Sequence, residues 1–141
     1  MATPAAAWRR AHLVMGGLTL LGFAITGFHM LWTLPGLFEE GGNPVRFLYR
    51  ANHLYLLFAG LLNLTLGSYL QLCAGGWRRR VQAFGSGCLL VAPLVLFPAF
   101  FIDPPRLSPK RPTTEAAIFL VFIGTLCQLP GRGSRPGSPQ D

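Results

Sequence analysis

Long apolar stretches separated by short polar clusters dominate the hydrophobic pattern of the chain. Three of them, at about residues 13–34, 51–72 and 81–102, contain no Asp, Glu, Lys or Arg. At a helical rise of about 1.5 Å per residue, each is long enough to cross a hydrocarbon layer about 30 Å thick. The pattern therefore predicts three membrane-spanning helices.

A fourth stretch, at about residues 113–130, is shorter, and its uninterrupted apolar run covers only residues 116–129. This length fits either a re-entrant helix or a short spanning helix in a locally thinned bilayer, and we expect it to span. The predicted fold class is all-α: an integral membrane bundle of four transmembrane helices with short loops, forming one domain over residues 1–131. The tail at 132–141, rich in Gly, Ser and Pro, is expected to be disordered.

The first stretch also has the basic flank and apolar run of a secretory signal peptide, with Arg9 and Arg10 before it. Its apolar run is too long for such a peptide, however, and no A-x-A cleavage site follows. We therefore expect this helix to remain in the protein.

Two prolines, Pro93 and Pro98, lie inside the third stretch. Proline has no backbone N–H, so each one frees a carbonyl of the preceding helical turn. Neighbouring helices can satisfy such carbonyls within a bilayer, so the stretch is predicted to be helical and kinked.

Composition agrees with the membrane interpretation, since 51% of the residues are hydrophobic and only 12% are charged. Soluble domains carry about 25% charged residues. The net charge of +7 lies at the expected helix ends, where it suits lipid head groups, and no basic face with interleaved aromatics indicates nucleic-acid binding. Eleven Arg against one Lys, with abundant Ala, Gly and Pro, indicates a GC-rich genome and hence a bacterial inner membrane.

The distribution of Lys and Arg predicts the orientation. Basic residues collect on the cytoplasmic side of membrane proteins, and the first helix usually dominates. Both termini are therefore expected in the cytoplasm. With four crossings, seven basic residues fall on that side (Arg9, Arg10, Arg78, Arg79, Arg80, Arg132, Arg135) and five on the other (Arg46, Arg50, Arg106, Lys110, Arg111).

Small and polar residues recur along one face of each of the first two helices. Such stripes let membrane helices approach closely and bond to each other, so the two are predicted to pack as a hairpin. The stripes are Thr19, Gly22, Thr26 and His29 in the first helix, and Tyr55, Ala59, Asn63, Gly67 and Gln71 in the second.

His29 and His53 are the candidate cofactor ligands. Both lie near the outer ends of antiparallel neighbours, and two imidazoles on facing helices suit a b-type haem or a metal ion. The alternative is a structural role, in which each ring bonds a carbonyl or a head group. We favour the structural role, so the cofactor is left open, with haem b as the alternative.

A second candidate site groups Arg50, Asn52, Tyr55 and Asn63 of the second helix with His53. Arg50 and His53 are three residues apart and share a helix face, where they suit an anionic group such as a lipid phosphate, or a quinone carbonyl. The alternative is interfacial anchoring, which Arg and Tyr favour at this depth.

Catalytic motifs are absent from the sequence. It contains no P-loop, GxSxG or HExxH pattern, and its three cysteines form no CxxC pair, so no metal site is predicted. We therefore expect a non-enzymatic polytopic membrane protein, an accessory or partner-dependent subunit. Its partners are the lipid bilayer and either a larger membrane complex or further copies of itself.

Overall fold

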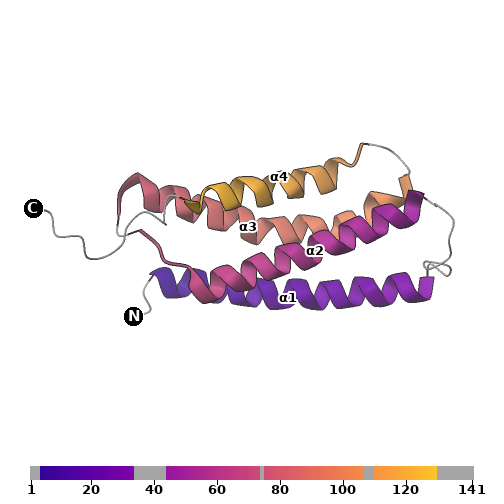
Figure 1. Cartoon of the computed structure of the whole chain (residues 1–141), viewed down its shortest axis with the longest axis horizontal. Helices are drawn as coiled ribbons and strands as arrows, with labels where there is room; N and C mark the ends of the chain where they lie inside the picture. The colour runs from indigo at the N-terminus through magenta and orange to yellow at the C-terminus, as the bar shows by residue number, and fades with distance from the viewer. Residues whose placement is uncertain (1–3, 34–43, 74, 107–109, 130–141) are drawn as a thin grey trace, which may run out of the picture.

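The computed structural model describes residues 4–33, 44–73, 75–106 and 110–129. Four helices follow one another along the chain and run alternately up and down (Figure 1). They are α1 (Pro4–Thr33), α2 (Pro44–Tyr69), α3 (Gly76–Ile102) and α4 (Pro112–Leu126), with a short 3-10 turn, η1 (Pro104–Arg106), between α3 and α4. The described residues contain no strand, so the predicted all-α architecture of four helices is confirmed. The predicted tail at 132–141 lies outside the described residues.

Helix ends differ from the apolar boundaries seen in the sequence. α1 begins at Pro4 and α3 at Gly76, well before residues 13 and 81, because the Ala-rich and Arg-rich flanks are themselves good helix formers. α2 ends at Tyr69 and α4 at Leu126, a turn before the predicted ends. Neither Pro93 nor Pro98 interrupts α3.

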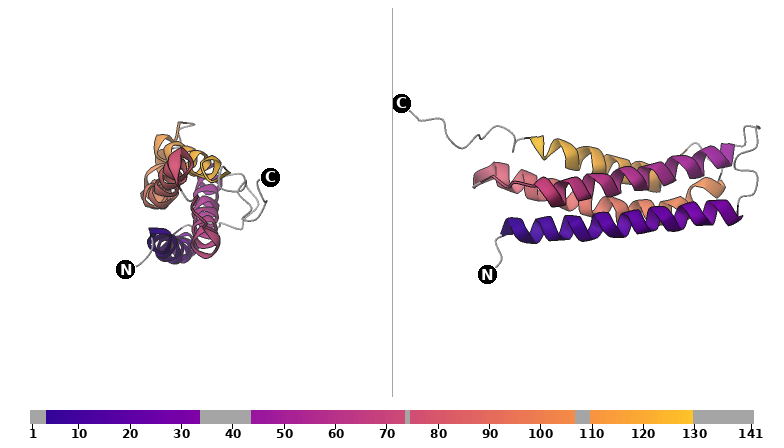
Figure 2. Two further views of the ribbon diagram at one scale, coloured as in Figure 1. Left: turned by 90° about the vertical axis from the view of Figure 1, so that its left-hand side faces the viewer. Right: turned by 60° about the horizontal axis from the view of Figure 1, so that its bottom comes forward.

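The bundle consists of two helical hairpins, α1 with α2 and α3 with α4, joined mainly through α2 and α3. Viewed along the bundle, α1 and α4 lie at opposite edges (Figure 2). Glycines bring the backbones of each hairpin close together. A Cβ placed on Gly67 of α2 would stand 2.8 Å from the backbone nitrogen of Leu13, and one on Gly85 of α3 would stand 2.8 Å from the carbonyl oxygen of Gly124.

The outer surface of the bundle is far more apolar than that of a soluble bundle, and the interior holds both apolar and polar side chains. Large hydrophobic side chains cover the outside of all four helices; Trp32, for example, is 80% exposed and Phe119 64%. The side chains buried in the interior include nine polar or charged ones: His12, Thr19, Thr26, Asn52, Asn63, Gln82, Ser86, Asp103 and Thr114.

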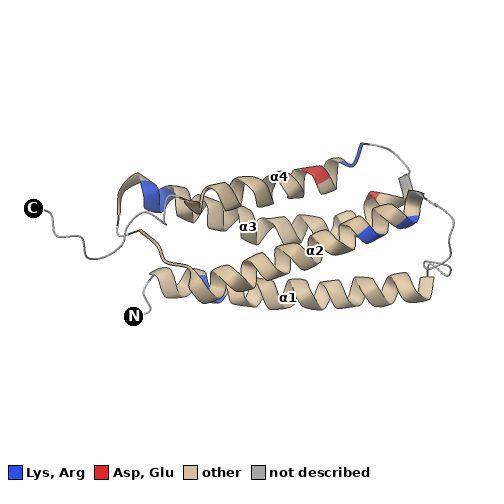
Figure 3. Cartoon of the chain, viewed as in Figure 1, with Lys and Arg blue, Asp and Glu red and all other residues tan. Residues whose placement is uncertain are grey.

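Charged residues gather at the two ends of the bundle and leave its middle free (Figure 3). Among the described residues, two helices, over Ala5–Thr33 and Gly76–Ile102, are long and apolar enough to cross a membrane. α2 has Asn52, His53 and Asn63 within its apolar stretch, and α4 is a shorter apolar helix of 15 residues.

Candidate functional site

A buried polar network joins α1, α2 and α3. The Nδ2 group of Asn63 donates hydrogen bonds to the carbonyl oxygens of Ala59 and Leu89, both at 2.9 Å. The Leu89 carbonyl is the one that Pro93, four residues later, leaves without its helical N–H. A neighbouring helix thus satisfies the carbonyl that this proline frees.

The same network determines which nitrogen of His12 carries a proton. Both hydrogens of the Asn63 amide are used, so its Oδ1 acts as an acceptor. This oxygen lies 2.7 Å from Nδ1 of His12, which must therefore be the protonated ring nitrogen. In the neutral ring Nε2 then carries a lone pair, and this buried atom has no hydrogen-bond partner among the described residues.

A second buried network joins α2, α3 and α4 at the opposite end. Oδ2 of Asp103 accepts hydrogen bonds from the backbone N–H and the hydroxyl of Thr114, at 2.8 and 2.6 Å. The Thr114 hydroxyl also lies 3.3 Å from Oδ1 of Asn52, whose Nδ2 donates to the carbonyl of Ala99. Asp103, just after α3, thereby satisfies an N–H of the first turn of α4. Oδ1 of Asn52 also accepts a longer bond of 3.4 Å from Arg111.

At the other end of the bundle from this second network, polar side chains form hydrogen bonds at the ends of the helices. Nε and Nη2 of Arg9 donate to the carbonyls of Gly67 and Ser68 in the last turn of α2, at 3.1 and 2.9 Å. A basic group is favourable there, because the last carbonyls of a helix lack helical partners. Gln82 accepts from the N–H of Cys73, and Gln128 donates to Ser86 across α3 and α4.

His29 and His53, the predicted cofactor ligands, have different neighbours. His53 stacks on Phe23 with ring centroids 3.9 Å apart, and its Nδ1 lies 2.9 Å from the Thr26 hydroxyl, so it faces α1. The ring of His29 meets Phe100 and Phe101 of α3 edge to face. None of the contacts described for the two imidazoles joins one to the other.

The residues of the predicted stripe on α1 do not all face α2. Thr26 contacts α2 through His53, whereas His29 is directed toward α3. A Cβ on Gly22 would likewise meet Phe97 of α3 at 3.1 Å. The stripe therefore serves two neighbouring helices, because α1 also packs beside α3.

The residues of the predicted lipid or quinone site are spread along α2. Asn52 and Asn63 are both fully buried in the networks above, and eleven residues of helix separate them by about 16 Å. Tyr55 is half-buried and packs against the apolar core, and Arg50 is half-buried near the start of the helix. The structure thus gives the two asparagines roles in helix packing.

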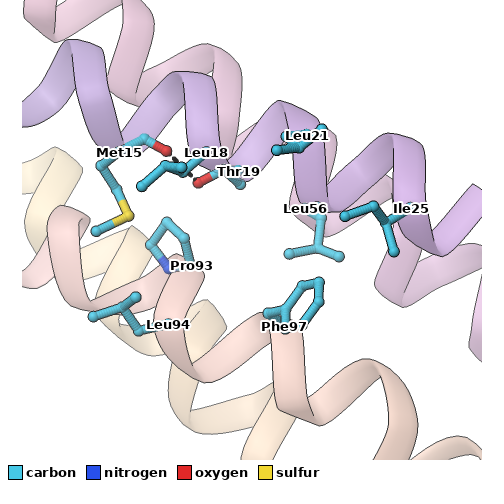
Figure 4. A pocket seen from close by; sticks show the side chains of 10 residues that line it. Met15, Leu18, Thr19, Leu21, Ile25, Leu56, Pro93, Leu94 and Phe97 are labelled. Atoms are coloured by element: carbon cyan, nitrogen blue, oxygen red, sulfur yellow. Dashed lines mark hydrogen bonds between the residues drawn. The ribbon is translucent and has the colours of Figure 1, made fainter.

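An apolar groove runs between α1 and α3, with Leu56 of α2 also lining it (Figure 4). Its volume is about 280 Å³. Met15, Leu18, Leu21 and Ile25 line the α1 side, and Pro93, Leu94 and Phe97 the α3 side; Thr19 and Gly22 complete it.

Sequence reasoning missed His12, Gln82 and the Asp103–Thr114 pair as interior residues. His12 lies just before the apolar stretch at residues 13–34, and an apolar run does not show where the buried part of a bundle begins. One signal was present: a proline frees the carbonyl four residues before it, and a polar residue of a neighbouring helix is needed to bond it.

Within the four described segments, no three His, Cys, Asp or Glu side chains gather closely enough to hold a metal ion. Comparisons with protein-family models, with curated proteins and with solved structures find no match to this chain. Its function must therefore be argued from its own geometry.

Proposed function

We propose that this chain is a four-span integral membrane protein of a bacterial inner membrane, with both termini in the cytoplasm. The observation that carries the proposal is the outer surface of the four helices, which is covered by large apolar side chains although the bundle also has an apolar core. Water on that outer surface would leave large apolar areas exposed, whereas acyl chains solvate them at no such cost.

The two helices with weaker hydropathy fit the same proposal. Asn52 and Asn63 lower the hydropathy of α2, yet both side chains are fully buried and bond to α3 rather than to the surroundings. α4 is short, but Phe119 and Phe122 cover its outer face. Bilayers thin locally around short helices at modest cost.

We further propose a non-enzymatic role as an accessory or partner-dependent subunit. The polar groups of the two networks hold helices to one another: Asn63 and Asn52 bond α3, Asp103 bonds α4, and Arg9 caps α2. Buried polar residues of this kind specify packing. The exposed aromatic side chains suit either lipid or another membrane subunit.

Native mass spectrometry of the tagged chain, extracted mildly from its own membranes, tests this role. We expect the chain to be released together with one or more other membrane polypeptides at fixed stoichiometry. Recovery only as a monomer, from extracts in which a known membrane complex stays intact, would contradict the proposed accessory role.

A further inference from the structure

The ring of His12 is enclosed at the end of the bundle where α1 begins and α2 ends. Its Nδ1–H donates a hydrogen bond of 2.7 Å to Oδ1 of Asn63, whereas the buried Nε2 has no partner among the described residues. A neutral imidazole has one donor and one acceptor. The closed structure therefore holds the neutral ring and leaves only its acceptor unpaired.

The hydrogen bonds of Arg9 lie between this pair and the ends of the two helices. Arg9 comes one turn before His12 on α1, and Gly67, whose carbonyl it bonds, comes one turn after Asn63 on α2. A further bond joins Arg9 to the carbonyl of Ser68. Water that approaches the ring from this end of the bundle therefore meets the bonds of Arg9 first.

A proton on Nε2 of His12 has no favourable place in this closed structure. It would turn the unpaired acceptor into a donor without an acceptor, and it would give the enclosed ring a full positive charge. Burying a charged group without a counter-charge costs much more than burying an unpaired neutral acceptor. An imidazole that reaches water, by contrast, takes up a proton at a pH of about 6.5.

The charged groups of the described residues do not offset this cost. On the same face of α1, the guanidinium of Arg9 has the same sign as a protonated ring. The groups that α2 and α3 bring to this layer are neutral: the Asn63 amide and the carbonyl of Leu89, which that amide bonds. The two described carboxylates, Asp103 and Glu115, lie at the opposite end of the bundle.

From these contacts we infer that His12 is a pH-sensitive switch between a closed and an open form of the α1–α2 hairpin. The neutral ring holds the closed form through its bond to Asn63. A proton from water adds to the lone pair of Nε2 in the open form, where the ring reaches water. Opening separates the ring from Asn63 and the Arg9 side chain from the end of α2, so hydrogen bonds alone are broken.

Hydrogen exchange of the full chain in phosphatidylcholine nanodiscs, read by mass spectrometry, tests the inference. The readout is the backbone exchange of residues 64–69, corrected for the intrinsic effect of pH on exchange. Because the open form binds the proton and the closed form does not, acid shifts the equilibrium toward opening. We expect the opening constant to rise about tenfold between pH 7.5 and pH 5.5.

Two histidine variants assign the effect. In His12→Asn the amide can still donate to Asn63 but takes up no proton in this range, so the rise with acid should disappear. His29→Asn is the matched control, because His29 is also half-buried or more but contacts Phe100 and Phe101 instead of this layer. This control should keep the tenfold rise.

A measurement that leaves His12 intact covers the case in which His12→Asn does not fold. The chain has three histidines, so a His29→Gln/His53→Gln double variant with a histidine-free tag contains His12 as its only imidazole. Nitrogen-15 NMR of this variant should show a protonated Nδ1 and an unprotonated Nε2 at pH 7.5. On acidification, Nε2 should become protonated over the same pH range in which residues 64–69 begin to exchange faster.

Proton uptake by His12 without faster exchange at the end of α2 would overturn the inference. So would exchange that does not respond to acid in the unaltered chain, or an equal response in a folded His12→Asn variant. Nanodiscs expose both faces of the bilayer to the same pH, so the result is independent of which end of the bundle faces the cytoplasm.

Discussion

The bond between Asn63 and the carbonyl of Leu89 is the contact in which residue-level chemistry most clearly fits the proposed membrane interior. Pro93 removes the ordinary partner of that carbonyl, and in a bilayer water cannot replace it. The side chain of another helix takes its place. Asn63 of α2 thus replaces the hydrogen bond that Pro93 of α3 removes.

Asn63→Leu should therefore lower the free energy of unfolding by about 1–3 kcal/mol. In a Pro93→Ala background the same change should cost about 0.5–1 kcal/mol less, because residue 93 regains an N–H for the Leu89 carbonyl. SDS-induced unfolding of the four proteins in mixed micelles, followed by circular dichroism, measures this coupling. Strict additivity of the two changes would show that the bond does not compensate for the proline.

The carboxylate of Asp103 should control the start of α4, since it accepts the backbone N–H of Thr114. Asp103→Ala is expected to speed hydrogen exchange of the Thr114 amide by about tenfold, the effect of losing a helix cap worth about 1–1.5 kcal/mol. Asp103→Asn keeps an acceptor oxygen and should recover most of the protection. Equal exchange in both variants would rule out this capping role.

At the scale of the helices, the sequence predicts where α1, α2 and α3 lie, because long uncharged apolar runs indicate helices of that length. The sequence predicts the ends of these helices poorly. The Ala-rich and Arg-rich flanks are good helix formers and extend a helix beyond its apolar run. Which residues of two helices contact each other depends on the offset between segments that are far apart in the sequence. Residue 12 meets residue 63 only because α1 and α2 are antiparallel with that offset, which no local pattern contains.

The contact of Gly85 with Gly124 should determine how closely α3 and α4 pack. Gly85→Leu is expected to cost about 1–3 kcal/mol, because its Cβ would collide with the Gly124 carbonyl and with Cys127. Gly87→Leu is the control, since a Cβ there meets nothing within 4 Å. Unfolding in SDS compares the two, and a loss of stability in the Gly87 variant equal to that in the Gly85 variant would contradict close packing.

For the whole molecule, the two hairpins place charge at both ends and apolar side chains around the middle. The candidate site was less predictable than the fold. The sequence shows which polar residues lie inside the apolar stretches, but their partners lie on other helices. His12 shows this best, because its position before the first apolar run gave no sign that its ring is enclosed.

The most direct test of the membrane embedding is whether α3 crosses the bilayer, as the four-span arrangement requires, and it is made by cysteine accessibility in membrane vesicles of known sidedness. Arg78→Cys and Lys110→Cys are made in a chain whose Cys73, Cys88 and Cys127 are replaced by Ala. The two positions are exposed and lie at opposite ends of the bundle, near the starts of α3 and of α4. We expect an impermeant maleimide to label position 110 from the outer face only and position 78 from the cytoplasmic face only. Labelling of both positions from the same face, or recovery of the chain in the soluble fraction without detergent, would contradict the account.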